Sequence, residues 1–464
     1  MKNKKFITLG FASVGIAIML LSVNLFGNSE SKEKTDKQET SRLEALAKFT
    51  KVISIVEQYN TDKQETSRLE ALAKFTKVIS IVEQYNVDEI TIEKLMDKAL
   101  KGMMSNLDAH SNFLTQKDYK NLKVQTDGEF GGLGITVGMR DGALTVISPI
   151  EGTPADKAGL KASDIILKIN DGSTLGMTID EAVSIMRGKV GDPIDLTIVR
   201  SGEAKPLPIH IVRDIISIQS VYTKTINDKT LYIRVTSFDK KVVKDVQKAI
   251  VEHSSKTKAI ILDLRNNPGG LLDQAVGLVD LFVDSGDIVS QKGRKESDKQ
   301  VYSANSNNTV TKVPLVVLVN GGSASASEIV SGALQDHKRG VIIGTKTFGK
   351  GSVQVVLPIT QTEAIKLTIA RYYLPSGRTI QAVGVTPDIE VFPGEYKSHK
   401  NNFSIKEADL KKHLEKELEK VSTKEVKKEN KEDKKDIITP EMLNKDIQLK
   451  EAVDILKALV IIKG

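Results

Sequence analysis

Three serines stand two residues apart in the stretch SASAS, residues 323–327, directly before a predicted helix. A serine hydroxyl becomes a nucleophile only when a neighbouring base takes its proton. The nearest histidine in sequence, His337, follows Ser325 by twelve residues, which on a helix is about 18 Å and out of reach. Helix starts also collect serine for structural reasons, and Ser325 with Glu328 has the spacing of a capping box. The serines alone therefore do not establish a catalytic site.

A lysine and a glutamine in TKTFGKGSVQ, residues 345–354, form a second candidate. If the chain enters a strand here, Lys350 and Gln354 lie on one face, so the glutamine amide can orient the lysine amine. A lysine acts as a base only when burial lowers its pKa from about 10.4 toward neutrality. The alternative is an exposed lysine on a glycine-rich turn.

The same stretch raises a rival function, because Gly344 to Lys350 matches the G-x-x-x-x-G-K pattern of a phosphate-binding loop. Asp263, at the end of an apolar run, has the position of a magnesium-holding acid. Two details exclude this interpretation. Gly351 replaces the required serine or threonine, and SVQVVLPI then alternates like a strand where the nucleotide loop needs a helix.

A third candidate is the loop in LDLRNNPGG, residues 262–270, which follows a predicted buried strand. Asparagine, proline and glycine free backbone N–H groups that can bind an anion, as half of an oxyanion hole does. Ordinary turn chemistry explains the same residues. The loop is therefore a candidate only in combination with the other two stretches.

Together, GGSASASEI, ALQD, TFGKGSVQ and DLRNNPGG closely resemble the signature motifs of the carboxyl-terminal processing proteases, the tail-specific serine peptidases of family S41. The resemblance extends from residue 61 to the carboxyl end. It implies that Ser325 is the nucleophile, that Lys350 is the base and that Gln354 positions the lysine. It also implies oxyanion donors at the amides of Gly270 and Ala326, with Gly269 as a near alternative, and it implies no cofactor.

The segment 126–213 resembles a PDZ domain of the permuted bacterial kind, with short alternating strands and glycine-rich turns. Its loop offers consecutive amides to the carboxylate of a peptide, at Gly132, Leu133, Gly134 and Ile135. The strand that follows can pair with the peptide by β-augmentation. A helix over 178–187 is expected to form the other wall. The alternative is a purely structural glycine-rich turn.

Composition narrows the function further. The 464 residues contain no cysteine and no tryptophan, which excludes disulfides, thiolate zinc sites and cysteine nucleophiles. The net charge is +7, but lysines are interspersed with glutamates rather than gathered in one stripe. With no aromatic and basic recognition pattern, we expect no binding to nucleic acid.

The amino-terminal sequence predicts export. Lys2, Lys4 and Lys5 precede an uncharged run over residues 6–26, and about 20 apolar residues suffice to span a bilayer. No clear small-x-small cleavage site follows, so an uncleaved membrane anchor is favoured over a cleaved signal peptide. We expect the protein in the cell envelope, on the periplasmic side of the inner membrane.

A perfect tandem repeat follows, because residues 35–60 recur without change at 61–86. Apolar residues at helical spacing predict a helix in each copy. Two copies are too few for a solenoid, and the extra copy is expected to lengthen a helical stalk. Whether the two helices stack or run on is open. Because the second copy continues directly into the family-like VDEITIEKLM, residues 35–60 are predicted to be dispensable.

The predicted fold class is α/β, with a crotonase-like S41 core, an inserted PDZ domain and helical regions at both ends. The predicted parts are a signal peptide or anchor over 1–30, a helical region over 31–125, the PDZ domain over 126–213, the peptidase core over 214–395, and a charged linker with a helix over 396–464. In the last part, lysine and glutamate dominate 404–436, and Thr439-Pro440 is predicted to start one amphipathic helix that runs to Leu459.

These expectations combine into an exported serine endopeptidase that binds unstructured carboxyl-terminal tails and cleaves them. The alternative is a non-proteolytic PDZ and S41-like binding protein; the intact Ser325 and Lys350 argue against it. Expected partners are proteins or peptides with free carboxyl-terminal tails, and the membrane through the amino-terminal segment. We also consider an adaptor protein and a homo-oligomer formed through the terminal helices.

Overall fold

The computed structural model describes residues 47–54, 65–227, 229–396 and 436–463. The predicted signal or anchor over 1–30 and residues 404–435 of the predicted charged linker lie outside these residues. Within the described ranges, no helix has the length and apolar character needed to cross a membrane. The chain divides into two units, one formed by residues up to 115 with 356–367 and one formed by 116–355 with 368–464.

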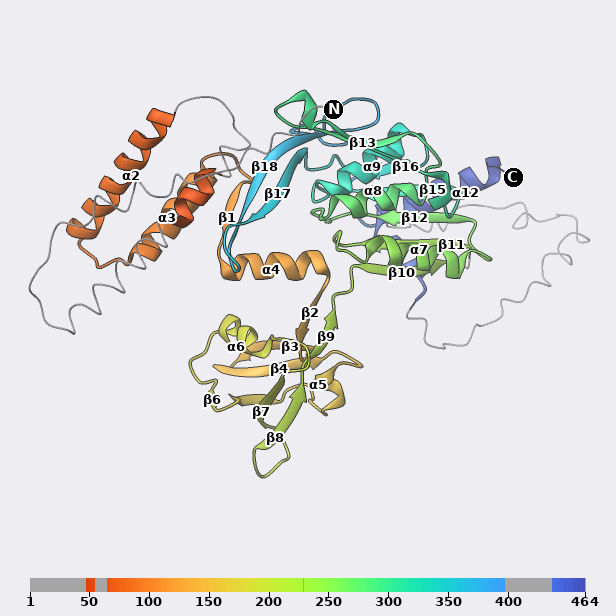
Figure 1. Cartoon of the computed structure of the whole chain (residues 1–464). Helices are drawn as coiled ribbons and strands as arrows, with labels where there is room; N and C mark the ends of the chain where they lie inside the picture. The colour runs from red at the N-terminus through yellow and green to blue at the C-terminus, as the bar shows by residue number, and fades with distance from the viewer. Residues whose placement is uncertain (1–46, 55–64, 228, 397–435, 464) are drawn as a thin grey trace, which may run out of the picture. The chain divides into compact units, whose positions relative to one another are not determined.

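A six-stranded, mostly parallel sheet is the centre of the second unit (Figure 1). The apolar runs predicted to be buried strands, at 259–263, 315–319 and 341–344, are its inner strands. Their order places the loops that follow them at one edge of the sheet, because parallel strands all end on the same side. The strands, in spatial order, are β10 (Val221–Ile226), β11 (Thr230–Val235), β12 (Ala259–Asp263), β15 (Leu315–Val319), β16 (Val341–Gly344) and β19 (Ile389–Glu390).

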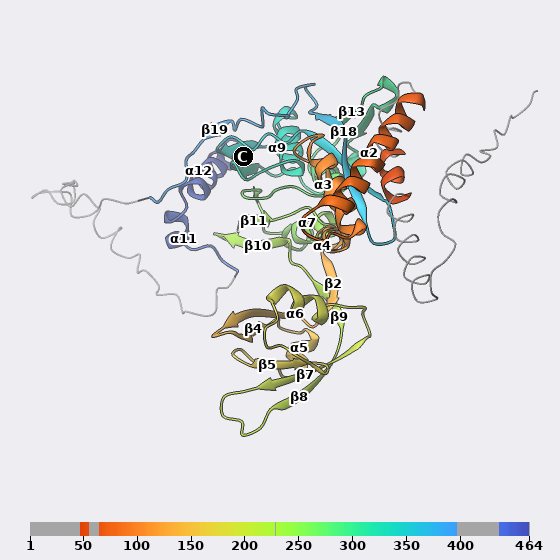
Figure 2. The ribbon, with the colours of Figure 1, turned by 90° about the vertical axis from the view of Figure 1, so that its left-hand side faces the viewer.

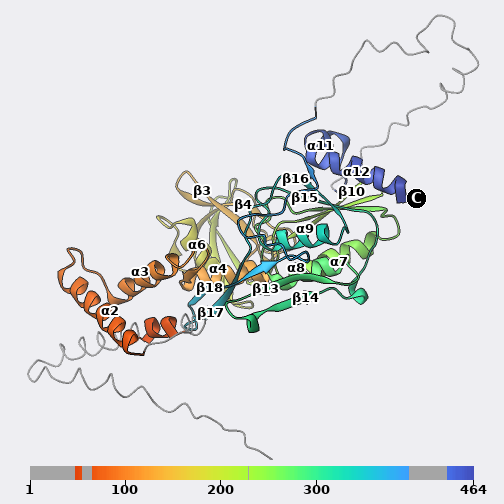
Figure 3. The same ribbon diagram turned by 90° about the horizontal axis from the view of Figure 1, so that it is seen from above.

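Helices cover both faces of this sheet, as Figures 2 and 3 show. Side chains alternate between the faces of a strand, so Leu231 and Ile233 pack against one set of helices and Tyr232 against the other. The first set is α7 (Val242–His253), α8 (Leu272–Asp280) and α9 (Ala326–Asp336). The second face is covered by α12 (Ile447–Lys463), which buries Leu449, Ala452 and Leu456 on the sheet. Because helices cover both faces of the sheet, its inner strands are apolar on both faces.

The carboxyl-terminal helix differs from the prediction, because it is broken rather than continuous. Thr439 does start a helix, and its hydroxyl accepts the Met442 N–H, but α11 (Pro440–Asn444) ends after five residues. Asp446 then starts α12, where its carboxylate accepts the Leu449 N–H at 3.1 Å. Aspartate is a preferred N-cap residue, and Asp446 starts a new helix at a point where the spacing of apolar residues alone predicts a continuous one.

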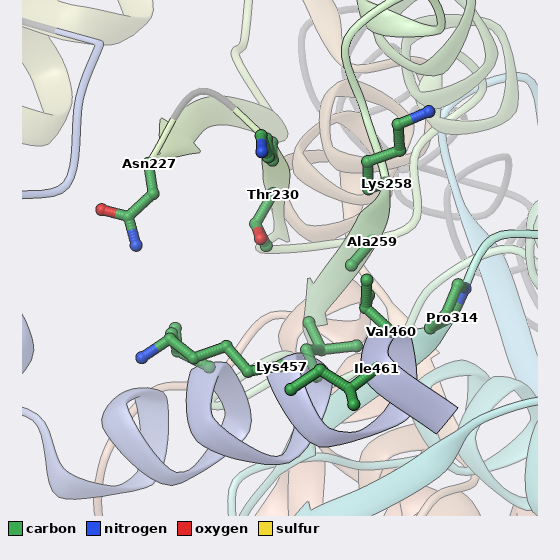
Figure 4. Close-up of a pocket in the computed structure, with 11 residues that line it drawn as sticks. Asn227, Thr230, Lys258, Ala259, Pro314, Lys457, Val460 and Ile461 are labelled. Atoms are coloured by element: carbon green, nitrogen blue, oxygen red, sulfur yellow. The ribbon is translucent and has the colours of Figure 1, made fainter. Parts of the chain in front are cut away.

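A hollow of about 710 Å³ lies between α12 and the starts of the central strands (Figure 4). Thr230, Ala259 and Pro314 line it from the sheet side, and Val460 and Ile461 line it from the helix. These sheet residues begin or precede their strands. The hollow is therefore at the opposite strand ends from the loops that carry the predicted site.

The PDZ-like part of the second unit forms a separate antiparallel sheet with its own core of Leu144, Val146, Ile166, Leu196 and similar residues. The helix predicted over 178–187 is confirmed and spans 179–186, with its capping box between Thr178 and Glu181. The elements are α4 (Gln116–Asp127), β2 (Glu129–Gly132), β3 (Ile135–Arg140), β4 (Ala143–Pro149), α5 (Pro154–Lys157), β5 (Ile165–Ile169), β6 (Gly172–Ser173), α6 (Ile179–Met186), β7 (Pro193–Val199), β8 (Leu207–Val212) and β9 (Asp214–Ser217).

One buried ion pair fixes a turn of this sheet. The Arg200 guanidinium donates to both carboxylate oxygens of Asp164, at 2.8 and 2.7 Å, and the Lys161 N–H donates to the same carboxylate. Burial by itself raises the pKa of Asp164, but these hydrogen bonds outweigh burial and hold its pKa below the usual range.

The first unit brings the two repeat copies together. Phe49 and Phe75 are equivalent positions of the two copies, and their rings stack with centroids 3.9 Å apart. The first copy, helical over 47–54, also docks through Lys48, which pairs with Asp97 and Glu363. The helices stack rather than run on. The other elements here are α2 (Glu65–Tyr85), α3 (Ile92–Ser105) and β1 (Asn112–Leu114), which pairs with residues 364–366.

The two copies have the same sequence but different environments. Val52 of the first copy is fully buried, whereas its equivalent Val78 is 50% exposed. At this position the first copy is packed and the second copy is exposed, although Ile79 of the second copy is also buried. Because the copies are identical, deleting 35–60 or 61–86 produces the same chain, and the predicted dispensability applies to one copy rather than to a particular one.

The remaining strands belong to a separate five-stranded sheet. β18 pairs with β13 through residues 371–373, and β14 pairs with β13. Their bounds are β13 (Asp287–Lys292), β14 (Gln300–Ser303), β17 (Ser352–Pro358) and β18 (Ala364–Tyr373). Two short 3₁₀ turns, at 296–298 and 306–308, precede and follow β14.

Candidate active site

The structure separates the three serines by their environment. Ser323 and Ser327 are fully buried. The Ser323 hydroxyl donates to the Leu264 carbonyl at 2.8 Å, and the Ser327 hydroxyl donates to the Asn267 carbonyl at 2.9 Å. Both therefore join the SASAS segment to the loop after β12. Ser325 is only half-buried, which leaves it as the serine of the three that a substrate can reach.

Ser325 stands at the start of α9 in an unusual backbone conformation, with φ 55° and ψ −111°. A positive φ is rare for a residue with a side chain and stores strain that the surrounding structure must hold. Such a sharp turn between strand and helix presents a side chain outward, as nucleophile elbows do. Hydrogen bonds on both sides hold the turn, including the Ser325 N–H to Glu328 at 2.8 Å.

Glu328 connects the serine to the lysine loop, which the sequence did not reveal. Its carboxylate is fully buried and accepts four hydrogen bonds. Oxygen Oε2 accepts from the backbone N–H of Ser325 and of Lys350, at 2.8 and 2.9 Å. Oxygen Oε1 accepts from the Thr347 hydroxyl at 2.6 Å and the Gly349 N–H at 2.7 Å. One carboxylate oxygen thus sets the spacing between the backbones of Ser325 and Lys350.

A strand follows Lys350, but Lys350 itself lies outside it, so the shared face predicted for Lys350 and Gln354 does not follow from strand geometry. β17 begins at Ser352, so the helix that a phosphate-binding loop requires is absent at this position. Ser352 and Gln354 lie on one face, and the Gln354 amide donates to the Ser352 hydroxyl at 2.8 Å and to the Thr368 hydroxyl at 3.4 Å. These bonds fix the orientation of the Gln354 side chain beside the start of the strand.

The loop after β12 approaches Ser325 through its two glycines, which both have positive φ. A Cβ on Gly269 would lie 2.9 Å from Ser325 Cβ and 3.0 Å from Ala326 N. A Cβ on Gly270 would lie 2.3 Å from the Phe238 carbonyl oxygen, so no larger residue fits at either position. Gly269 therefore lets the loop backbone lie directly against the start of α9, and Gly270 lets it lie against the backbone of Phe238.

The predicted oxyanion donors differ in how their amides are used. The Gly269 N–H donates to the Asn267 side chain at 2.9 Å. Among the described residues, the N–H groups of Gly270 and Ala326 have no acceptor. This arrangement favours Gly270 over Gly269 as the partner of Ala326 in binding a substrate oxygen.

Arg265 anchors the base of the same loop. Its guanidinium donates to Asp263 at 2.6 Å and to Asp446, at the start of α12, at 2.8 Å. Burial alone lowers the pKa of Arg265, but the bonds to both carboxylates outweigh burial and raise it. Burial and the neighbouring Asp263 raise the pKa of Tyr232, so its phenol keeps its proton and donates to Asp263 at 2.7 Å. Both carboxylate oxygens of Asp263 therefore accept hydrogen bonds from neighbouring side chains.

His337 is confirmed to lie away from the serine. It caps the far end of α9, and its ring nitrogen Nε2 is 2.7 Å from the Asp287 carbonyl oxygen. The histidine therefore has a structural contact at the opposite end of the helix from Ser325.

The predicted peptide-binding residues line a groove of about 250 Å³. Gly132, Leu133, Gly134 and Ile135 form one side, and Ile179, Val183 and Met186 of α6 form the other. Among the described residues, the N–H groups of Leu133 and Gly134 have no acceptor. A groove with an apolar wall and free amides at one end has the chemistry to hold an apolar residue with a carboxylate.

The chain matches two family models, peptidase family S41 over residues 229–391 and PDZ domain over residues 145–200. It is 44% identical to the carboxy-terminal-processing protease of Bartonella bacilliformis, over 79% of this chain and 83% of that protein. It is 38% identical to the carboxy-terminal processing protease CtpA of Bacillus subtilis, over 66% of this chain and 65% of that protein.

Among solved structures, the photosystem II D1 C-terminal processing protease is 27% identical, with a TM-score of 0.43 over 76% of this chain and 93% of that chain. The identity to the two curated bacterial proteases extends well beyond the catalytic motifs, over 373 and 306 residues. The chain thus belongs to the carboxy-terminal processing proteases, the serine peptidases of family S41 that carry a PDZ domain.

Proposed function

We propose that this protein is an exported endopeptidase that cleaves unstructured carboxyl-terminal tails of proteins with a Ser325–Lys350 dyad. One observation carries the assignment of the dyad: the buried Glu328 carboxylate binds the backbones of both residues through a single oxygen. The half-buried Ser325 and the engaged hydroxyls of Ser323 and Ser327 support the choice among the serines.

In the proposed reaction, the Ser325 hydroxyl attacks the scissile carbonyl carbon while the neutral Lys350 amine takes its proton. The carbonyl oxygen becomes an oxyanion, which accepts from the N–H groups of Gly270 and Ala326. Lys350 then returns the proton to the departing amine, and an acyl-enzyme forms. A water molecule, deprotonated by the same lysine, releases the new carboxyl terminus. Gln354 keeps the lysine amine oriented.

Recruitment of the tail is assigned to the PDZ groove. The free N–H groups of Leu133 and Gly134 suit a terminal carboxylate, and the α6 wall suits an apolar last residue. The similar proteins are carboxy-terminal processing proteases by name, which supports tails as the substrate class. The basic start and uncharged run at 6–26 support a site of action in the cell envelope, on the periplasmic side of the inner membrane.

The test is digestion of an unfolded protein with a free carboxyl tail. We expect cleavage by the wild type and none by Ser325→Ala. Lys350→Arg is expected to be inactive, because guanidinium does not give up its proton in proteins. Lys346→Arg, at an exposed lysine of the same loop, is the matched control and should cleave normally. Gln354→Ala is expected to be milder than either dyad variant.

The pH dependence gives a second readout. An ammonium has no lone pair, so the rate should rise with pH through the pKa of Lys350 and then level off. Substantial activity of Lys350→Arg would show that the amine is not the base. Normal tail binding without any cleavage by the wild type would instead establish the alternative, a non-proteolytic binding protein.

A further inference from the structure

A pocket of about 500 Å³ on the central sheet carries a pattern that neither the peptidase nor the PDZ groove uses. In the antiparallel pair β10 and β11, Tyr222 lies opposite Arg234 and Lys224 lies opposite Tyr232. Alternate residues of a strand share a face, so two aromatic rings and two cations form a square on one face. Met442 of α11 is among the apolar residues that complete the lining.

The cations of this pocket are not balanced by acids. Asp263 and Asp446 both bind Arg265 in the pocket wall. Among the described residues, neither Lys224 nor Arg234 forms an ion pair or a hydrogen bond through its side chain, and Arg234 Nε is buried. A buried donor without an acceptor is unfavourable, more so when it is charged. The pocket therefore offers donors and positive charge to a ligand that supplies an acceptor.

The shape and the rest of the lining define the ligand further. Pockets of about 300–1,000 Å³ lined by aromatic and apolar groups with a few polar anchors are typical of small-molecule sites. A guanidinium matches the geometry of a carboxylate or a phosphate. Tyr222 is 41% exposed, so its ring is available to stack on an incoming group. The ligand needs an anionic head and an apolar or aromatic body.

We propose that this pocket binds a small organic anion, a carboxylate or a phosphate ester with an aromatic or apolar body. The head contacts Arg234 and Lys224, and the body lies between Tyr222 and Met442. The site is separate from the proposed tail groove, since none of its residues line that groove. Through Arg265, one wall of the pocket is also the base of the loop that carries Gly270.

The test is calorimetric titration of the full chain with four probes: phenyl phosphate, benzoate, inorganic phosphate and benzyl alcohol. We expect at least one of the two aromatic anions to bind, and which one binds identifies the head group. Benzyl alcohol, which lacks the charge, is expected not to bind. Inorganic phosphate, which lacks the body, is expected to bind more weakly than phenyl phosphate.

Variants locate the binding. Arg234→Gln and Lys224→Gln should each lower the affinity for the bound anion at least about 10-fold, which is the effect of losing one hydrogen bond to a charged group. Lys258→Gln, at an exposed lysine in the hollow of Figure 4, is the matched control and should bind like the wild type. Thermal unfolding checks that each variant is folded, and Lys224→Gln alone suffices if Arg234→Gln does not fold. Absence of binding by both aromatic anions, equal binding of benzyl alcohol, or unchanged affinity in Lys224→Gln overturns the proposal.

Discussion

Replacing Glu328 by glutamine is expected to disable the peptidase without unfolding it. Each carboxylate oxygen of Glu328 accepts two hydrogen bonds, so an amide NH₂ in place of either oxygen faces two donors. A buried donor without an acceptor costs about 1–3 kcal/mol, or about 2–6 kcal/mol for two. The structure relieves this cost by moving the Ser325 and Lys350 backbones out of position, and a misplacement of about 1 Å lowers kcat about 100-fold.

A matched control separates this role from helix capping. Glu181 occupies the same position in the capping box of α6, but it is exposed. Glutamine also completes a capping box, so Glu181→Gln should leave kcat within about two-fold of the wild type. The assay is steady-state cleavage of an unfolded protein substrate, with kcat and KM determined separately and thermal unfolding of both variants. If folded Glu328→Gln cleaves as fast as Glu181→Gln, the carboxylate does not position the dyad.

Three further predictions follow from other contacts. Arg200→Met leaves Asp164 buried without its partner and should destabilise the PDZ domain by about 3–5 kcal/mol at pH 7. Because the pKa of Asp164 is depressed in the folded protein, the wild type loses this stability as pH falls below about 4, so denaturation curves of the two proteins should converge there. In chemical denaturation, Val52→Asp should lower the free energy of unfolding by at least about 2 kcal/mol. Val78→Asp, the same change at the equivalent exposed position, should lower it by less than about 0.5 kcal/mol. Equal losses would contradict the packing assigned to Val52 of the first copy. Amidating the carboxyl end of a tail peptide should weaken its binding about 10- to 150-fold in a titration, and equal affinity would remove the role assigned to the carboxylate.

Local sequence patterns predicted a strand or a helix correctly where the residues of that segment alone determine its structure. The apolar runs before the site loops are the inner strands, and the Thr178–Glu181 box does start α6. The Ser325–Glu328 spacing correctly indicated a bond from the Ser325 N–H. It gave no sign that Glu328 also binds Thr347 and its neighbours, because those partners come from a later loop that only the fold brings near.

Long-range pairs and repeated segments set the limit of such predictions. Asp446 was part of a pattern that predicted one continuous helix, and its contact with Arg265 spans 181 positions of the chain. No periodicity encodes such a pairing. The repeat is a stronger case, because Val52 and Val78 have identical neighbours in sequence and differ in burial. Only packing against the rest of the first unit distinguishes them.

The binding of Arg265 by two carboxylates, Asp263 and Asp446, has a consequence for the order in which the contacts near the site can form. Asp446 leaves the ribosome 181 residues after Arg265, which at about 5–20 residues per second takes about 10–35 s. Until then Arg265 has Asp263 as its one carboxylate partner among the described residues, although Ser325 and Lys350 have already been made. With the activity on unfolded chains proposed above, the peptidase is most exposed to self-cleavage while its own chain is unfinished. The contact of Arg265 with its second carboxylate therefore cannot form until most of the chain has been made.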